Sequence, residues 1–140
     1  MPVRRVLVDS GPLIALFNRR ERRHQYFDSR VQSLASEGAQ FLTTWPCVTE
    51  ATHMLKMLDN RIDMLHWIAA GGVSAHDFPS TELLAMADWM RRYSERREMD
   101  FADASLMWLA ISVSTTEILT VDRADFERYR LPSGKPFSIL

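Results

Sequence analysis

The sequence predicts an α/β fold in which one parallel sheet lies between helices. Short apolar segments alternate along the 140-residue chain with longer segments whose apolar residues recur at helical spacing. That alternation is typical of a parallel sheet, because the crossover between two parallel strands usually contains a helix. The length suits one domain with one hydrophobic core, which we place over residues 1–140.

Five segments are predicted to form the strands of this sheet. Two of them, VRRVLVD and EILTVD, are apolar stretches that each end in an aspartate. In chain order, the predicted strands are residues 3–9, 40–44, 73–78, 117–122 and 135–140.

Seven segments between and around these strands are predicted to be helical. Pro12 and Pro46 fall in the first turns of two of them, where a missing N–H costs least. Gly38 and Gly72 follow two others, as glycines that end helices often do. The predicted helices are residues 11–18, 20–38, 45–58, 60–72, 79–98, 100–114 and 123–130.

Composition excludes several classes of protein. Hydrophobic residues make up 46% and charged residues 25%, which are ordinary values for a globular chain and exclude a disordered or fibrous one. Cys47 is the single cysteine, so neither an internal disulfide nor a multi-thiolate zinc site can form. The first apolar stretch stops at Asp9, too soon for a signal peptide, and no apolar run is long enough to span a membrane. We therefore expect a cytoplasmic protein.

Aspartates and a glutamate fall where the predicted fold would bring them together. Asp9 and Asp122 end two parallel strands, whose carboxyl ends share the edge of the sheet where ligands bind. Glu50 lies about one turn into the helix after the second strand, and Asp103 lies at the start of the apolar helix. Converging carboxylates repel one another, so they either take up protons or hold a hard cation. Oxygen-only ligands favour Mg²⁺ or Mn²⁺.

Four segments of the chain match, in order, the motif regions of the PIN-domain family, and they most resemble the VapC-type toxin ribonucleases. The segments are VLVDSGPLIALFN, LTTWPCVTEATHML, MDFADASLMWLA and ILTVDRADFERYR, and together they span most of the chain. The resemblance implies a five-stranded parallel sheet and Mg²⁺- or Mn²⁺-dependent cleavage of RNA. It also implies a toxin held silent by an antitoxin protein, with a homodimer as one possible state. Gly11-Pro12 departs from the family pattern in the first loop.

The resemblance also assigns roles to individual residues. It implies that the metal is held by Asp9, Glu50, Asp103 and Asp122, which would be the catalytic acids. Asp100 matches an additional acid of many members. Ser10 and Thr120 match hydroxyl residues that support the first and last acids.

Each acid also has a structural interpretation. Asp9 and Asp122 could cap the helices that follow them. Glu50 could interact with a helix dipole. Asp100 and Asp103 together approximate a capping box, which leaves open whether Asp100 is a helix cap or a direct metal ligand.

Arginine makes up all of the positive charge except Lys56 and Lys135. If five acids form one site, the rest of the chain is mildly basic, which suits an anionic substrate. The clusters Arg19-Arg20-Arg22-Arg23 and Arg91-Arg92-Arg96-Arg97 either contact phosphates or are solvated helix faces.

The sequence also bears on functions other than RNA cleavage. A receiver-type phosphotransfer domain would need a phosphorylatable aspartate on a central strand, and QFLTT has none. A helical di-iron site would need a second motif like Glu50-Ala51-Thr52-His53, which is missing from the sequence. A non-catalytic binding protein with the same fold would not need to keep four acids, and it remains the alternative.

Overall fold

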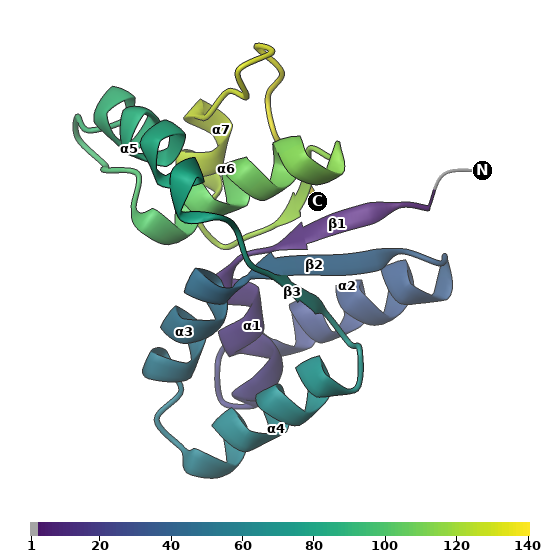
Figure 1. The fold of residues 1–140 in the computed structure, drawn as a ribbon. Helices are drawn as coiled ribbons and strands as arrows, with labels where there is room; N and C mark the ends of the chain where they lie inside the picture. The colour runs from purple at the N-terminus through teal and green to yellow at the C-terminus, as the bar shows by residue number, and fades with distance from the viewer. Residues whose placement is uncertain (1–2) are drawn as a thin grey trace.

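A computed structural model describes residues 3–140, and it contains the α/β fold that the sequence predicts. Its sheet has five parallel strands in the order β3-β2-β1-β4-β5 (Figure 1). Residues 1 and 2 of the predicted domain lie outside the described residues. The strands are β1 (Arg5–Val8), β2 (Gln40–Thr44), β3 (Ser74–His76), β4 (Glu117–Leu119) and β5 (Ser138–Ile139).

Helices cover both faces of the sheet, with α1–α4 on one side and α5–α7 on the other (Figure 1). None of the helices between residues 3 and 140 combines the length and apolar character needed to cross a membrane. The helices are α1 (Ser10–Phe17), α2 (His24–Ser36), α3 (Trp45–Met54), α4 (Leu58–Ala69), α5 (Leu83–Arg92), α6 (Phe101–Val113) and α7 (Arg123–Arg128), with a short 3-10 turn, η1 (Ser80–Glu82), before α5.

The central strands are buried on both faces, which explains their nearly continuous apolar sequences. Alternate residues point to opposite sides of a strand. Leu7 and Ile118 therefore join the core beneath α5–α7, whereas Val6, Val8 and Leu119 join the core beneath α1–α4. The two cores hold β1 in the middle of the molecule.

The topology brings together the ends of strands that are far apart in the sequence. β1 lies between β2 and β4, with Leu7 opposite both Leu42 and Ile118. The backbone N–H of Asp9 continues this ladder by donating to the Leu119 carbonyl oxygen, at 3.1 Å. The segments that follow β1, β2 and β4 therefore emerge at one edge of the sheet.

The predicted helix at residues 79–98 is too long. Helix α5 ends at Arg92, and Arg96 adopts a left-handed backbone with φ of 62°. Met99 is only 2% exposed, and its N–H donates to the Tyr93 carbonyl oxygen at 2.9 Å. Burial of Met99 thus requires the chain to leave the helix and turn back toward the core.

The predicted helices at residues 20–38 and 45–58 also differ from the structure. Hydrogen-bonded turns occupy Asn18–Arg23, so α2 begins only at His24. Helix α3 ends at Met54 because Leu55, which is 2% exposed, turns into the core before α4 begins at Leu58. One consequence is that Arg19, Arg20, Arg22 and Arg23 lie in a loop rather than on a helix face.

Candidate metal centre

Asp9 follows β1 directly and is buried, with 2% of its surface exposed. One carboxylate oxygen accepts a hydrogen bond from the Ser10 N–H at 2.8 Å, and the other accepts from the Thr120 hydroxyl at 2.8 Å. The Thr120 hydroxyl oxygen also accepts from the N–H of Asp122 at 3.0 Å. Thr120 therefore joins the two loops that carry the first and last acids, whereas Ser10 contacts Asp9 through its backbone N–H.

Asp103 lies in the first turn of α6 and is 6% exposed. Its Oδ2 atom accepts a hydrogen bond from the Tyr129 hydroxyl at 2.7 Å. The ring of Tyr129 is fully buried and packs edge-on against Phe126 and Tyr93, at 5.1 and 5.0 Å between ring centres. A residue that follows α7 therefore fixes the orientation of an acid on α6.

Asp100 is the N-cap of α6, because its Oδ1 atom accepts from the N–H of Asp103 at 2.8 Å. In a full capping box the third helical residue turns back to the cap. Here the carboxylate at that position is hydrogen-bonded to Tyr129. The structure thus assigns the cap to Asp100, whose second carboxylate oxygen takes no part in that bond.

Glu50 and Asp122 complete the group of acids, and both are only partly shielded from solvent. The pKa of Glu50 is raised mainly by partial burial and, to a smaller extent, by the negative charges of Asp100 and Asp122. The hydrogen bond from the Ser10 side chain lowers it. Partial burial also raises the pKa of Asp122. Asp122 precedes α7 without making a side-chain cap, so the capping interpretation does not account for it.

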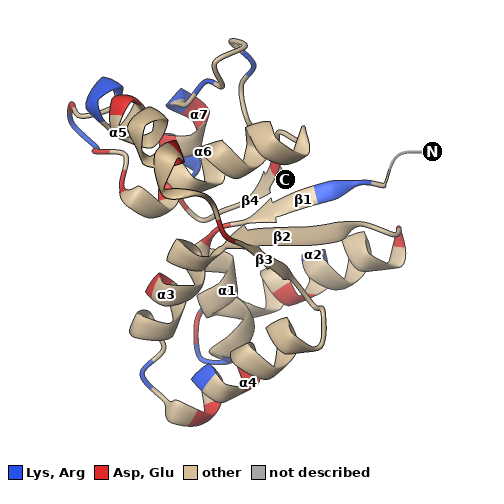
Figure 2. Ribbon diagram, in the orientation of Figure 1, with Lys and Arg blue, Asp and Glu red and all other residues tan. Residues whose placement is uncertain are grey.

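The two buried acids have strongly raised pKa values in the absence of a metal. Burial is the main reason that the pKa of Asp9 rises to about 7, with smaller contributions from the charges of Asp122 and Glu50. Burial likewise raises the pKa of Asp103 to about 8, together with the charges of Asp9, Asp100 and Asp122. Asp9, Glu50, Asp100 and Asp122 each raise the pKa of at least one other acid of the group. Figure 2 shows acidic segments where the chain leaves the central strands.

The donor atoms of this group fit a hard divalent cation, since all of them are carboxylate oxygens. Within residues 3–140, no three His, Cys, Asp or Glu side chains lie close enough together to ligate one ion directly. Mg²⁺ is commonly bound through one or two carboxylates and keeps several of its waters. The side chains present therefore suit an ion that is held partly through water.

The interior also contains polar contacts that the sequence did not reveal. The Thr44 and Ser105 hydroxyl oxygens are 2.6 Å apart, and the Thr43 hydroxyl donates to the Val8 carbonyl oxygen at 2.6 Å. These bonds connect the end of β2 to β1 and α6. They help to set the position of α6, which carries Asp103.

Two arginines lie close enough to influence the site. Arg97 and Arg23 both lower the pKa of Asp122, in opposition to its burial and its acidic neighbours. Arg97 pairs with Asp125 at 3.7 Å, and its carbonyl oxygen accepts from Arg128 at 2.6 Å. Each predicted arginine cluster therefore contributes one member near the acids, and both members lie in loops.

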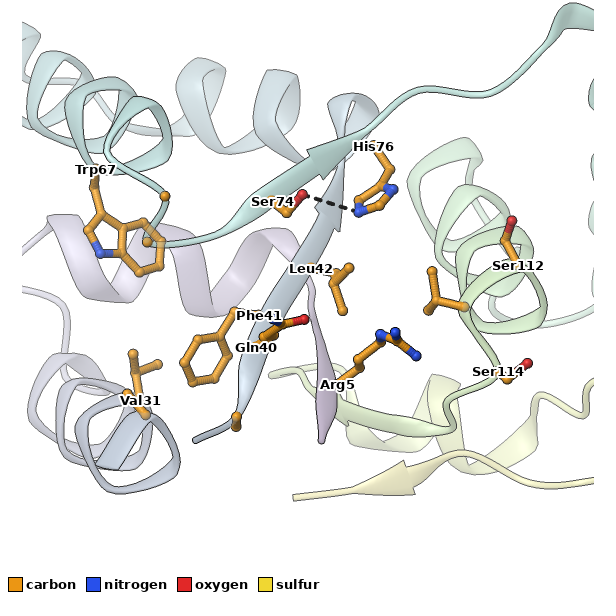
Figure 3. A pocket seen from close by; sticks show the side chains of 15 residues that line it. Arg5, Val31, Gln40, Phe41, Leu42, Trp67, Ser74, His76, Ser112 and Ser114 are labelled. Atoms are coloured by element: carbon orange, nitrogen blue, oxygen red, sulfur yellow. Dashed lines mark hydrogen bonds between the residues drawn. The ribbon is translucent and has the colours of Figure 1, made fainter. Parts of the chain in front are cut away.

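A cavity of about 900 Å³ lies away from the acids. It lies beside the first residues of β2, where β3 is too short to pair with them (Figure 3). Trp67 and Phe41 border it on one side of the sheet, and Arg5 and Ser114 on the other (Figure 3). No acidic residue lines this cavity, and the strands begin here rather than end.

Comparison with known proteins gives matches among solved structures. No family model matches the chain, and no curated protein matches it. VapC20 of Mycobacterium tuberculosis, described as a sarcin–ricin loop cleaving toxin, is 16% identical, with a TM-score of 0.64 over 81% of this chain and 86% of that one. FitAcB from Neisseria gonorrhoeae is 19% identical, with a TM-score of 0.52 over 86% of this chain and 90% of that one. At these identities the likeness establishes a shared fold.

Proposed function

We propose that this chain, which has the PIN-like fold of the VapC-type toxins, is a metal-dependent endoribonuclease that hydrolyses RNA phosphodiester bonds. One observation carries the proposal: acids from four separate segments share the edge where the central strands end, and two of them are buried with raised pKa values. Burying carboxylates beside one another costs folding free energy. A bound cation offsets that cost, and a protein without a ligand here would have no such compensation.

In this proposal Asp9, Glu50, Asp103 and Asp122 hold Mg²⁺ or Mn²⁺. Asp100 can join them through the oxygen that does not cap α6. When bound, such an ion lends positive charge against the negative charge that develops on a phosphodiester under attack.

The chain itself supplies orientation and a proton acceptor. Thr120 and the Ser10 N–H fix both oxygens of Asp9, and Tyr129 fixes one oxygen of Asp103. A carboxylate oxygen beside the attacking water accepts its proton as the water oxygen bonds to phosphorus. The bond from phosphorus to the 3′-oxygen then breaks, and the 3′-oxygen takes up a proton, which leaves a 5′-phosphate and a 3′-hydroxyl end. Arg23 and Arg97 are placed to attract the RNA backbone toward the acids.

We also propose that the enzyme is a toxin with an antitoxin partner. The support is the description of VapC20 as a toxin, together with an exposed apolar surface at the end of α3 and along α4. This surface consists of Met54, Met57, Leu58, Ile62 and Leu65, which are 38–65% exposed. A partner helix or a second copy of the chain could cover it. Co-purification with the product of an adjacent reading frame, and its loss in Met57→Asp and Leu58→Asp, would test the partner.

The activity is tested by incubating purified protein with total cellular RNA and mapping new ends by sequencing. We expect site-selective cleavage with Mg²⁺ or Mn²⁺ and none in EDTA. Asp9→Asn and Asp103→Asn should abolish it, because the amide keeps the shape but loses the charge. Asp88→Asn, an exposed acid on α5, is the matched control and should cleave normally. Cleavage that persists in EDTA or in both variants would refute the proposal and favour a non-catalytic binding protein or a contaminant.

A further inference from the structure

A second recess adjoins the acids, between the first turns of α3 and α6. Its volume is about 600 Å³, within the range of small-molecule sites. Most of its wall is apolar, and Trp45, Pro46 and Phe101 contribute to it. Glu50 and Asp100 also line it, so the recess shares two acids with the predicted metal centre. We call it the aromatic groove.

Two exposed aromatic rings flank the aromatic groove. Trp45 is 46% exposed and Phe101 is 42% exposed, and each is the first residue of its helix. Phe101 is braced by an edge-on contact with Phe78, with the ring centres 5.9 Å apart. Phe78 in turn packs against Trp108 at 5.5 Å. The Phe101 ring is therefore held in place before any ligand arrives.

The charges around the aromatic groove restrict what can enter it. Glu50 and Asp100 would repel a phosphate or a carboxylate that lay in the groove itself. A second copy of this chain would trap both carboxylates in an interface, at a cost unless each found a partner. A flat, uncharged ring meets neither obstacle. It could stack on the aromatic side chains and use exposed His53 and Thr49 for hydrogen bonds.

We propose that the aromatic groove is a nucleobase subsite, in which one unpaired base beside the scissile phosphate stacks on Trp45 and Phe101. This rests on the proposed ribonuclease function and deepens it. A base can reach the groove only when it has left the helical stack, so the substrate is RNA that is single-stranded or looped at the cleavage site. Trp45 and Phe101 then determine which nucleotide lies next to the bond that is cut.

The test uses a short RNA that spans a cleavage site mapped in total RNA. A series of oligonucleotides, each lacking one base near the cut, is compared with the intact RNA by kcat/KM. For wild type, we expect one abasic position to lower kcat/KM about tenfold, mainly by raising KM, as the loss of one stacked base should. Trp45→Ala should lower kcat/KM on intact RNA by a similar factor. For Trp45→Ala, kcat/KM should fall almost no further when the RNA also lacks the base at the sensitive position.

Three further variants separate stacking from other effects. Trp45→Phe keeps an aromatic face and should retain most of the activity, whereas Trp45→Leu keeps apolar bulk and should not. Tyr26→Ala removes an even more exposed ring (53%) on α2 and should behave as wild type. Phe101→Ala should reproduce the result of Trp45→Ala, which guards against a folding defect at either residue.

The outcomes are distinct. Tolerance of every abasic position, or a Trp45→Ala loss that is equal on intact and abasic RNA, would overturn the subsite. If Trp45→Ala lost activity equally on intact and abasic RNA and also changed from dimer to monomer in sedimentation, the groove would be a subunit interface instead. If wild type cleaves RNA but passes none of these tests, the subsite fails and the ribonuclease stands. If wild type cleaves no RNA, the proposed function itself fails.

Discussion

The Tyr129 hydroxyl donates a hydrogen bond to Oδ2 of Asp103 at 2.7 Å, although the two residues are 26 positions apart. Both are buried, and the bond connects the segment after α7 to the first turn of α6. It leaves the other oxygen of Asp103 free for a cation. Asp103 can therefore be probed indirectly, by substituting Tyr129, which carries no charge at neutral pH.

Tyr129→Phe removes the hydroxyl group and keeps the ring. The buried Asp103 then loses a donor, which should lower the free energy of unfolding by about 1 kcal/mol. The loss should appear in EDTA as well as with metal, because the bond does not depend on an ion. Thermal melts of both proteins in both buffers measure it. An unchanged melting temperature would mean that the bond contributes nothing to stability.

Substitutions of Asp103 should separate its charge from its hydrogen bond. Above pH 8, where Asp103 is ionised in the metal-free protein, Asp103→Asn removes repulsion among the acids. Its amide oxygen can still accept from Tyr129, so the variant should melt at or above wild type in EDTA at pH 8.5. Asp103→Ala leaves the buried Tyr129 hydroxyl without this acceptor, at a cost of about 1–3 kcal/mol. Denaturant unfolding in EDTA checks the order. If Asp103→Asn lowered the free energy of unfolding as much as Asp103→Ala, repulsion among the acids would not be the dominant effect of Asp103 on stability.

The metal-free protein should lose stability as the pH rises. The pKa values of Asp9 and Asp103 are about 7 and 8 in the folded chain, against an ordinary value of 3.8. Between these limits the folded state binds more protons than the unfolded state, so stability falls as pH increases. Wild type in EDTA should therefore melt several degrees higher at pH 5 than at pH 8.5.

The doubly substituted protein Asp9→Asn/Asp103→Asn is the control for this pH effect. It lacks both titrating groups, so its melting temperature should change much less over the same range. A wild type that is more stable at pH 8.5 than at pH 5 in EDTA would contradict the raised pKa values.

Arg23 and Arg97 should contribute to RNA binding through phosphate contacts. Each replacement by Gln should weaken binding and reduce the slope of log K against log salt by about 1. Arg91 and Arg92 lie exposed in the last turn of α5, and Arg91→Gln/Arg92→Gln serves as the comparison. Binding measured in Ca²⁺ or with Asp103→Asn avoids cleavage. An equal dependence of log K on log salt in all variants would mean that Arg23 and Arg97 are solvated and do not contact phosphates.

The strands and the order of elements could be predicted because their signals are local. An apolar run that ends in Asp9 or Asp122 indicates both a buried strand and an acid at its end. The end of α5 could not be predicted, since the helical pattern continues through the arginines. Only the tertiary burial of Met99 shows that the chain must turn at Tyr93.

The positions of Asp9 and Asp122 after their strands could be predicted for the same reason, whereas the tyrosine that orients Asp103 could not. Tyr129 and Asp103 come together only in the folded chain, and no spacing in the sequence encodes their hydrogen bond. A buried tyrosine needs a partner for its hydroxyl, but sequence does not name that partner. The place of Trp45 at a groove beside Glu50 could not be predicted either, because that groove forms only where α3 and α6 meet. The metal roles of the acids remain predictions.

Calorimetric titration of Mn²⁺ into the metal-free protein at pH 7.5 tests the central claim most directly. We expect saturable binding to wild type, with protons released as the raised carboxyl groups ionise. Binding should be lost or greatly weakened in Asp9→Asn and Asp103→Asn and kept in Asp88→Asn. A wild type that takes up no Mn²⁺ or Mg²⁺ at millimolar concentration, or variants that bind as tightly as wild type, would contradict a metal centre formed by these acids.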